Sequence, residues 1–383
     1  MNFELSDEQR DLQATIREFA EQEIAPQAEA WDREHTFPLG VIRKLGSLGV
    51  MGLSFPEEYG GLNAGTLAQA LVIEELARVD SSVAITVGAN VALGGAPLLL
   101  FGSEEQKQHW LVPLAQGEIL GAFGSTEPGM GSDVAACETR AEEQDGRWVI
   151  NGTKSFITNA GTEMSGFVIV TAVTGMGNGR REVSTVLVPK GTPGYEIGRP
   201  YRKMGWHASD THELIFSDCM VGSDCLLGPR GKGVQHFLAI LDGGRIGVAA
   251  LGVGLAQGCL DISLGYARER KTFGQPIARY QAIQFMLADL ASQVQAARLL
   301  TYEAALLKDG GKPYTKAAAM AKLVASELAV RAADVAVQVH GGVGYMDETA
   351  AARFYRDAKI LTLGEGTSEV MKIVIARQLG MGE

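Results

Sequence analysis

Phe167-Val168-Ile169-Val170 is a run of β-branched and aromatic residues of the kind that forms a buried strand. Similar runs occupy Arg147-Trp148-Val149-Ile150, Ser184-Thr185-Val186-Leu187-Val188 and Glu213-Leu214-Ile215-Phe216. The pairs Asp145-Gly146 and Asn151-Gly152 and the segment Gly175-Met176-Gly177-Asn178-Gly179 are typical of turns between strands. Residues 117–228 are therefore predicted to form an antiparallel β-sandwich or barrel.

Helical patterns flank this β-region on both sides. Ser6-Asp7-Glu8-Gln9 has the form of a capping box, and apolar residues follow it at helical spacing up to Ile24. Further helices are predicted at 41–48, at 67–77 and, after a second box at 103–106, up to residue 114; long Ala- and Leu-rich stretches predict helices at 283–307 and 316–339, followed by a loop at 340–345. Because 383 residues exceed the usual size of one core, we expect an α+β protein with three domains: an all-α domain at 1–116, the β-domain at 117–228 and a helical domain at 229–383.

Composition excludes several classes of protein. The net charge of -11 and the pI near 5.2 disfavour a protein that binds nucleic acid. The least polar stretch, Val83–Phe101, is interrupted by Asn90 and Pro97, so no membrane span is predicted. The acidic N-terminus resembles neither a signal peptide nor a transit peptide, which favours a cytoplasmic protein. The four cysteines and six histidines lack zinc-binding or disulfide spacing, so no metal is expected.

The segment Leu363–Lys372, with the sequence LGEGTSEVMK, is the best candidate for chemistry. Glu365 lies between Gly364 and Gly366, whose missing side chains let the carboxylate and the backbone come close to a ligand. Such a carboxylate can act as a base. A structural role competes with this one: the two glycines can end one helix, Ser368 can cap the next, and Glu365 can lie at that helix's positive end.

Two segments combine hydroxyls, aromatic rings and free backbone donors, which are the groups that contact a planar polar cofactor. They are Gly121–Asp133, with the sequence GAFGSTEPGMGSD, and Phe156-Ile157-Thr158. A turn-rich loop and an ordinary strand would have the same composition, so both interpretations stay open. No Walker or Rossmann glycine motif is present in the sequence, and a dinucleotide must therefore be held in another way.

Two charged groups also allow two interpretations. Arg268–Gly274 ends a predicted helix, where its cations either complement the helix dipole or bind a pyrophosphate. Asp242 and Arg245 are three residues apart on a predicted helix. The simplest expectation for them is a surface ion pair of small energetic value.

As a whole, the chain resembles the acyl-CoA dehydrogenase family over nearly all of its 383 residues. The resemblance rests on blocks that occur in the family's order: Phe123–Asp133, Asn151–Thr158, Lys203–Thr211, Leu241–Arg245, Arg268–Gly274, Gln338–Gly342, Arg356–Lys359 and Glu365–Glu369. It implies a helical domain, a β-domain and a C-terminal four-helix bundle, in the same order as the changes in periodicity.

The resemblance implies an FAD-dependent enzyme of the kind that acts in fatty acid β-oxidation. Glu365 is then the base that removes the pro-R proton from Cα of a saturated acyl-CoA, and a hydride passes from Cβ to flavin N5, which gives a trans-2-enoyl-CoA. The thioester oxygen is expected between the backbone N–H of Glu365 and a ribityl hydroxyl of FAD. Burial should raise the pKa of Glu365 toward the working pH.

The family's site residues are carried over to the matching positions of this chain. The implied contacts with the isoalloxazine ring are Phe123, Ser125, Thr126, Gly131, Ser132, Phe156, Ile157 and Thr158. The ADP half of FAD is assigned to Arg270, Thr272, Phe273, Tyr280, Gln281, Gln338, Val339, Gly341 and Gly342, some of them from a neighbouring subunit, and Thr367 and Glu369 match further cofactor positions. Ser132, Asp242, Arg245 and Gly366 match positions near the thioester and pantetheine. A homotetramer of paired dimers and electron transfer flavoprotein as electron acceptor are also implied.

Some positions depart from the family pattern. Gly364 stands where many members have Tyr, which is expected to widen the cavity, and Phe156 replaces a common Trp. Other branches of the family place their base near Gly243 or Gly244. Because both of these are glycines here, Glu365 is the better assignment for the base.

The sequence narrows the substrate without fixing its length. No Arg occurs around Ser81 or Ser82, which disfavours a dicarboxylate such as glutaryl-CoA, and the pocket floor is expected among Val87–Gly95. Three alternatives to a dehydrogenase stay open. They are an acyl-CoA oxidase that passes electrons to oxygen, a flavin-free scaffold protein of the same fold, and a related flavin monooxygenase or nitroalkane oxidase.

Overall fold

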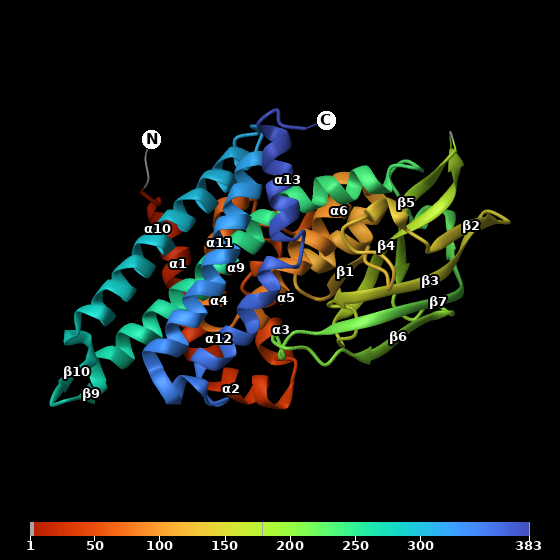
Figure 1. Cartoon of the computed structure of the whole chain (residues 1–383). Coiled ribbons are helices and arrows are strands. Elements are labelled where there is room, and N and C mark those ends of the chain that lie inside the picture. The colour runs from red at the N-terminus through yellow and green to blue at the C-terminus, as the bar shows by residue number, and fades with distance from the viewer. Residues whose placement is uncertain (1–3, 178, 383) are drawn as a thin grey trace.

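The structure is a computed structural model that describes residues 4–177 and 179–382. Helices fill one side of the molecule and a β-sheet fills the other (Figure 1). The N-terminal part contains α1 (Asp7–Phe19), α2 (Ala25–Glu34), α3 (Leu39–Ser47), α4 (Gly65–Val79), α5 (Ser81–Ala89), α6 (Ala96–Phe101), α7 (Glu104–Gln106) and α8 (Val112–Ala115). The C-terminal part contains α9 (Gly233–Glu269), α10 (Gln281–Asp309), α11 (Thr315–His340), α12 (Ala350–Ala358) and α13 (Ser368–Gln378), and a short hairpin of β9 (Lys271–Thr272) and β10 (Gln275–Pro276) follows α9. The three-part order of helices, sheet and helices is thus confirmed.

Both predicted capping boxes are present. The Ser6 hydroxyl accepts from the backbone N–H of Gln9, and the Gln9 side chain accepts from the N–H of Ser6. Ser103 and Gln106 repeat this exchange at the start of α7. These contacts span three residues, so the sequence alone was enough to predict them.

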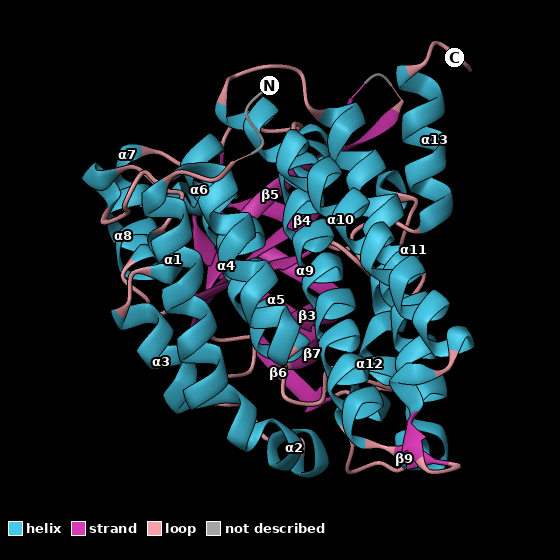
Figure 2. Ribbon diagram, turned by 90° about the vertical axis from the view of Figure 1, so that its left-hand side faces the viewer, coloured by secondary structure: helices cyan, strands magenta, loops and turns pink. Residues whose placement is uncertain are grey.

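The strands between the helices make one twisted sheet. They are β1 (Leu120–Gly124), β2 (Arg140–Gln144), β3 (Arg147–Thr158), β4 (Ser165–Gly177), β5 (Arg180–Pro189), β6 (Tyr195–Pro200), β7 (Thr211–Gly222) and β8 (Leu226–Leu227). In the described chain the order is β6-β7-β3-β2-β4-β5-β8, and β1 pairs with β4. Most neighbours are antiparallel, as expected, but β1 and β2 each pair with β4 in parallel. Figure 2 shows the sheet behind the helices.

The predicted turns have different outcomes. Asp145 and Gly146 both have positive φ, 50° and 74°, and join β2 to β3 in a tight hairpin. The prediction of a turn at Asn151-Gly152 is wrong, because these residues lie inside β3. The pairing register shifts there, and an added Cβ at Gly152 would lie 2.6 Å from Oγ1 of Thr139. Glycine therefore marks a bulge at this position. In the predicted turn 175–179, β4 continues to Gly177, and residue 178 lies outside the described residues.

The N-terminal and C-terminal helices share a single hydrophobic core. Ile73 and Leu76 of α4 belong to the same buried cluster as Val253 of α9. The two helices approach closely at glycines of α9: an added Cβ at Gly254 would lie 2.1 Å from the carbonyl oxygen of Glu74. Neither helical part is therefore packed independently of the other, and the domain boundaries at 116 and 228 stay predictions.

Two helices are long and apolar enough to cross a membrane by composition alone. They are 81–101, with a mean hydropathy of 1.8, and 233–269, with a mean hydropathy of 1.6. In each, 67% of the apolar window is buried inside the molecule, as in a core helix of a soluble protein. Asn90 and Pro97 do not break the first helix as expected, because a π-helical segment at Asn90–Gly95 connects α5 to α6. The absence of a membrane span stays a prediction.

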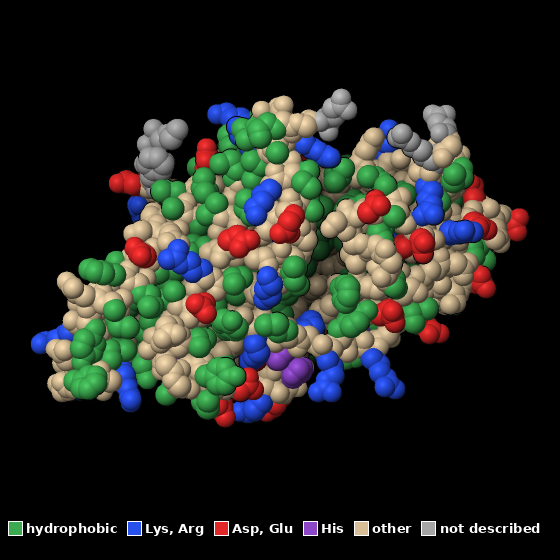
Figure 3. All heavy atoms as spheres, in the orientation of Figure 1, with side chains coloured by type: hydrophobic (Ala, Val, Ile, Leu, Met, Phe, Trp, Pro, Cys, Tyr) green, Lys and Arg blue, Asp and Glu red, His purple; other side chains and the backbone are tan. Residues whose placement is uncertain are grey.

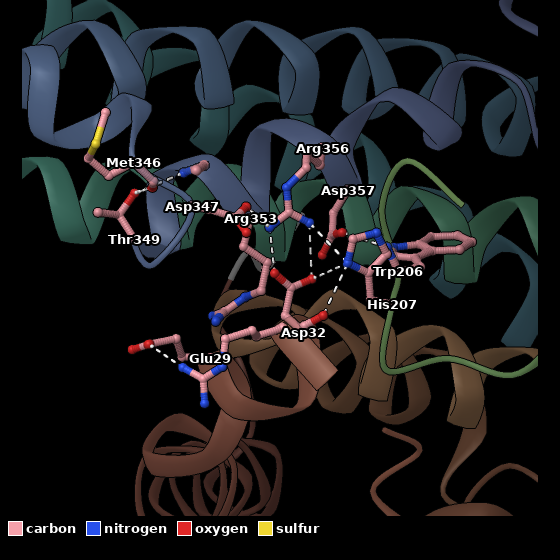
Figure 4. A network of polar contacts seen from close by, with 12 residues as sticks. Glu29, Asp32, Trp206, His207, Met346, Asp347, Thr349, Arg353, Arg356 and Asp357 are labelled. Atoms are coloured by element: carbon pink, nitrogen blue, oxygen red, sulfur yellow. Dashed lines mark hydrogen bonds and ion pairs between the residues drawn. The ribbon is translucent and has the colours of Figure 1, made fainter. Parts of the chain in front are cut away.

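A network of polar contacts joins all three parts of the chain (Figure 4). Arg356 of α12 donates two hydrogen bonds to Asp32 of α2, at 3.0 and 2.5 Å. The Asp357 carboxylate accepts from the backbone N–H of Trp206, in the segment between β6 and β7, at 2.6 Å. It also accepts from the Ser81 hydroxyl at 2.7 Å. A bidentate Arg–carboxylate pair of this kind fixes relative orientation as well as distance.

Candidate active site

The turn that holds Glu365 is strained. Glu365 has φ 51° and Gly366 has φ 93°, and a left-handed conformation costs a non-glycine residue about 1–3 kcal/mol. On one side, the N–H of Gly364 donates to the carbonyl of Ile360 at 2.8 Å. On the other side, Thr367 caps α13 by accepting from the N–H of Val370 at 3.3 Å. A helix cap is therefore present here, as the structural alternative predicted, but the capping residue is Thr367 and not Ser368. The same turn also presents the Glu365 carboxylate.

The Glu365 carboxylate lies against α9, next to Gly244. Its Oε2 atom is buried and has no hydrogen-bond partner among the described residues. An added Cβ at Gly244 would lie 2.5 Å from this oxygen, so the space is available only because residue 244 is a glycine. Burial raises the pKa of Glu365 to about 7, against the opposing charges of Lys322 and Arg245. A carboxylate with a pKa in this range can exchange a proton near neutral pH.

Arg245 is buried, contrary to the expected surface pair with Asp242. The residue is 4% exposed, and its Nη1 donates to Oδ1 of Asp242 at 2.5 Å. Asp242 also accepts from the Thr315 hydroxyl at 2.7 Å. The Nε atom of Arg245 is buried and lacks a hydrogen-bond partner within the described chain. Because α9 faces the Glu365 turn here, the periodicity of the helix alone could not show that this pair turns inward.

The loop after β1 is held rigid by a buried ion pair. Lys154 of β3 is 0% exposed, and its Nζ donates to Glu127 at 2.7 Å and to the carbonyl of Ser125 at 3.2 Å. Glu127 also accepts from the backbone N–H groups of Glu138 and Thr139 at 2.8 and 3.1 Å. Burial alone would raise the pKa of Glu127, but Lys154 and these donors lower it to about 2. Both residues lie within the sequence blocks Phe123–Asp133 and Asn151–Thr158, but no sequence pattern indicates that they pair.

The predicted isoalloxazine residues divide into those with a group free to contact a ligand and those that pack into the core. Phe156 has φ 62° and is 65% exposed, and an added Cβ at Gly131 would meet no described atom within 4 Å. The Ser125 hydroxyl is buried and has no partner among residues 4–177 and 179–382. In contrast, Phe123 and Ile157 are 7% and 3% exposed and contribute side chains to the core. An exposed ring, open backbone and an orphaned hydroxyl fit a planar cofactor that hydrogen-bonds along its edge.

The residues assigned to the ADP half of the cofactor gather elsewhere. Phe273, in the β9–β10 hairpin, has φ 49° and is 99% exposed. The Tyr280 hydroxyl donates to the carbonyl of Thr272 at 2.9 Å, and His340 at the end of α11 stacks on Tyr266 of α9 with ring centroids 4.4 Å apart. The hairpin and the end of α11 therefore lie together, at the far end of the helices from the sheet (Figure 1).

Arg245, which is assigned to the thioester, and Arg270, which is assigned to the ADP half of the cofactor, lie far apart in one molecule. Arg245 and Arg270 belong to α9 and its C-cap, and 25 residues of helix separate them by roughly 37 Å. Figure 3 shows a hollow between the helical side and the sheet, beside the place where Figure 1 draws the start of α13 in the same orientation. The Glu365 turn borders this region, because α13 begins directly after it. Among the described residues, no cluster of three or more His, Cys, Asp or Glu side chains is arranged to hold a metal ion.

Lys322 is a site residue that the sequence analysis did not identify. It is 0% exposed on α11, and its Nζ donates to the carbonyl of Gly366 at 2.5 Å. In the sequence, only its helical spacing could have indicated that Lys322 is buried. It lies on the same face of α11 as Ala318 and Ala325, which are both fully buried. A lysine on a buried, alanine-rich face needs a partner, but the sequence does not reveal which group supplies it.

Comparisons with known proteins cover the whole chain. The N-terminal domain family of acyl-CoA dehydrogenases matches residues 6–118, the middle domain family matches 122–219 and the C-terminal domain family matches 231–380. The probable acyl-CoA dehydrogenase YngJ of Bacillus subtilis is 50% identical over 380 residues, which are 99% of this chain and 100% of that protein.

Solved structures agree with these matches. Butyryl-CoA dehydrogenase from Megasphaera elsdenii superposes with a TM-score of 0.96 and 42% identity, over 99% of this chain and 100% of that one. A chain in a structure of the electron transferring flavoprotein of Acidaminococcus fermentans, which addresses flavin-based electron bifurcation, superposes with a TM-score of 0.96 and 45% identity over 99% of both chains. The chain therefore belongs to the acyl-CoA dehydrogenase family of FAD-dependent oxidoreductases.

Proposed function

We propose that this acyl-CoA dehydrogenase acts on short-chain saturated acyl-CoA thioesters and that Glu365 is its base. The observation that supports the base is the buried, unpartnered Oε2 of Glu365 on a strained turn beside the hollow. A carboxylate that lacks a polar partner is free to accept a proton from a substrate. The similarity to a butyryl-CoA dehydrogenase supports a short acyl chain.

The turn supplies more than the base. The α-proton of a thioester is weakly acidic, so the oxygen that gains charge must meet donors already in place. The backbone N–H of Glu365 is proposed as one of these donors. Asp242, Arg245, Ser132 and Gly366 are proposed to line the thioester and pantetheine. FAD, when bound, accepts the hydride that leaves Cβ.

The cofactor site is proposed to form between two copies of the chain. The isoalloxazine group and Thr367 and Glu369 belong to one copy, and the group around Arg270, Gln281 and Gln338–Gly342 reaches it from the other. In one copy, Arg270 lies about 37 Å along α9 from Arg245, which is proposed to line the thioester, and this separation supports the arrangement. Large apolar side chains on the C-terminal helices are also exposed, including Phe285, Leu299, Met320, Val324 and Ile373. They are proposed to be buried in a dimer, two of which form the tetramer.

Electron transfer flavoprotein is proposed as the electron acceptor. The similarity to a chain in a structure of an electron transferring flavoprotein supports this proposal. A cytoplasmic location belongs to the same proposal and rests on sequence composition.

An anaerobic titration with acyl-CoAs separates the dehydrogenase from an oxidase. The dehydrogenase should leave its reduced flavin stable on exposure to air until the acceptor flavoprotein is added, whereas an oxidase would turn over with oxygen alone.

The Glu365→Gln variant tests the base. It should retain FAD and reduce it with butyryl-CoA at least about 100-fold more slowly, because a positioned general base contributes that much or more. Stopped-flow absorbance near the flavin maximum measures the rate, and the visible spectrum of the purified variant gives flavin content. Undiminished reduction by the variant would remove Glu365 from the mechanism.

A further inference from the structure

Lys322 is a buried cation without a carboxylate of its own. Its side chain leaves α11 at a position that is 0% exposed, and its Nζ donates to the carbonyl of Gly366 at 2.5 Å. No carboxylate of the described residues forms an ion pair with it; the attraction that acts on it most is the charge of Glu365, at longer range. An ammonium group in such surroundings is costly to bury, so a purely structural role would be better filled by a neutral side chain.

We propose that Lys322 is a positioning residue for the reaction. Its ammonium group fixes the carbonyl of Gly366, and with it the left-handed turn, and its charge keeps the carboxylate of Glu365 ionised where water is excluded. The proposal rests on the proposed function, because it needs Glu365 to be the base. In this role Lys322 acts through the turn and through its charge, and not by contact with the substrate.

The turn needs such a support on its C-terminal side. The N–H of Gly364 and the cap at Thr367 fix the turn on either side of the Glu365–Gly366 step. Between them, both residues have positive φ, so the chain relaxes unless another group holds it. The hydrogen bond from Lys322 is the contact that holds the Gly366 carbonyl.

The charges around Glu365 single out Lys322. The charged and titratable groups that face this region are Lys322 and Glu327 of α11, Arg245 and Asp242 of α9, Tyr314 ahead of α11, and Glu369 of α13. Arg245 is already neutralised by Asp242, and Glu327 accepts from the Ser368 hydroxyl at 2.5 Å. Glu369 lies on the surface. Lys322 is therefore the cation with the largest influence on Glu365, and Arg245, which is paired with Asp242, has the second largest.

The protonation equilibria of the two groups are coupled. Burial raises the pKa of Glu365 to about 7, and the charge of Lys322 is the largest influence against that rise. Burial lowers the pKa of Lys322 to about 8, and the charge of Glu365 opposes that fall. Without the cation, the pKa of Glu365 should rise further, and most of the base should be protonated at neutral pH.

Three variants of the holoenzyme separate charge from hydrogen bonding. Lys322→Met removes both, Lys322→Gln keeps a neutral donor for the Gly366 carbonyl, and Lys322→Arg keeps the charge. Lys316→Met is the matched control, since it removes an exposed lysine from the same helix. Flavin reduction by butyryl-CoA is measured by stopped flow from pH 5.5 to 9.5, together with flavin content and melting temperature.

The midpoint of the acid limb should move upward by about 1 pH unit or more in the Met and Gln variants. It should stay at the wild-type position in Lys316→Met, and Lys322→Arg should restore it. A uniform loss of rate with an unmoved midpoint in both neutral variants would overturn the proposal, because a merely structural lysine gives that result. If Lys322→Met does not fold, Lys322→Gln alone decides between these outcomes.

Calorimetry gives a second readout without turnover. Binding of a trans-2-enoyl-CoA at pH 7, in two buffers with different ionisation enthalpies, counts the protons that the enzyme takes up. Lys322→Met and Lys322→Gln should take up fewer protons than wild type, because Glu365 in these variants is already protonated before the ligand binds. Equal uptake counts against the proposal. If Glu365→Gln keeps its rate, the proposed function itself fails. If Glu365→Gln loses its rate but the variants of Lys322 leave the midpoint of the acid limb unchanged, only the role of Lys322 fails.

Discussion

As the proposed base, Glu365 should set the pH at which the reaction can start. Its pKa is raised to about 7 by burial, and only the ionised form can accept a proton. We therefore expect kcat/KM for butyryl-CoA to rise with pH through a midpoint near 7 and to fall about tenfold per unit below it. A steady-state pH profile with the acceptor flavoprotein in excess measures this midpoint. A midpoint near that of an exposed glutamate would contradict the burial of the carboxylate in the working enzyme.

Gly244 provides the space in which this carboxylate lies. Gly244→Ala would place a Cβ 2.5 Å from Oε2 of Glu365, so the carboxylate must move. We expect a loss of at least about 10-fold in kcat/KM, since small misplacements of a reacting group are costly. Melting temperature should stay constant or rise slightly, because Ala stabilises a helix interior by up to about 1 kcal/mol relative to Gly.

Gly247→Ala is the control for this substitution. Gly247 lies one turn later on α9, and an added Cβ there would meet no described atom within 4 Å. Both variants change helix propensity equally, and only Gly244→Ala crowds the base. Equal activity of the two variants would show that the carboxylate does not depend on the space at Gly244.

At the scale of the elements, β3 holds the loop after β1 through Lys154. Removal of this lysine leaves the Glu127 carboxylate buried without its cation, which costs about 3–5 kcal/mol of unfolding free energy. Lys154→Met should therefore lower stability by that amount and reduce flavin content. The double variant Lys154→Met with Glu127→Gln should recover part of the loss, which a double-mutant cycle from denaturant unfolding measures. Strict additivity of the two single changes would mean that the pair does not act as a unit.

The elements that the sequence predicted are those defined by near neighbours. The two capping boxes and the Asp145-Gly146 hairpin depend on residues at most three positions apart, and all are present. The same reasoning failed at Asn151-Gly152, where a turn signal lies inside a strand. There the Asn151 side chain pairs with Asp218 of β7, so tertiary contact overrides the local preference.

The candidate site was predicted where a motif marks it and missed where distant contacts build it. Glu365 was identified from its two glycine neighbours and from the family resemblance. Lys322 reaches the same turn across 44 residues of sequence, and its contact with Gly366 is to a backbone carbonyl, which has no sequence signature. The burial of Arg245 was missed for the same reason, since α9 is apolar on most of its circumference.

At the scale of the whole molecule, a cofactor site shared by two copies makes a prediction about mixtures. Glu365→Gln removes the proposed base from a copy of the chain. Arg270→Ala should weaken FAD binding by the ADP-binding residues at the opposite end of a copy. If the two ends meet across a two-fold interface, a mixed dimer contains one intact site and one site with both defects. Co-refolding of the two inactive variants should restore about a quarter of wild-type activity, since half of the dimers are then mixed.

The mixture is assayed for flavin reduction after subunit exchange, with each variant refolded alone as the control. Total flavin content should stay at about half of the sites whether or not the copies mix, because every site with an intact Arg270 retains FAD, so a gain in activity reports mixing and not flavin uptake. Activity that stays at the level of the single variants would place the whole cofactor site within one copy, or would show that the copies do not associate through these helices.

The close packing of α4 against α9 has a consequence for synthesis of the chain on the ribosome. α4 ends at Val79 and α9 begins at Gly233, so the apolar face of α4 emerges long before the helix that covers it. At a typical elongation rate, the delay is on the order of 10 to 30 s. During that interval the nascent N-terminal helices cannot complete their core, and Leu76 and its neighbours are open to other hydrophobic surfaces. We therefore expect a nascent chain of this protein to present an apolar face to chaperones until α9 has left the exit tunnel.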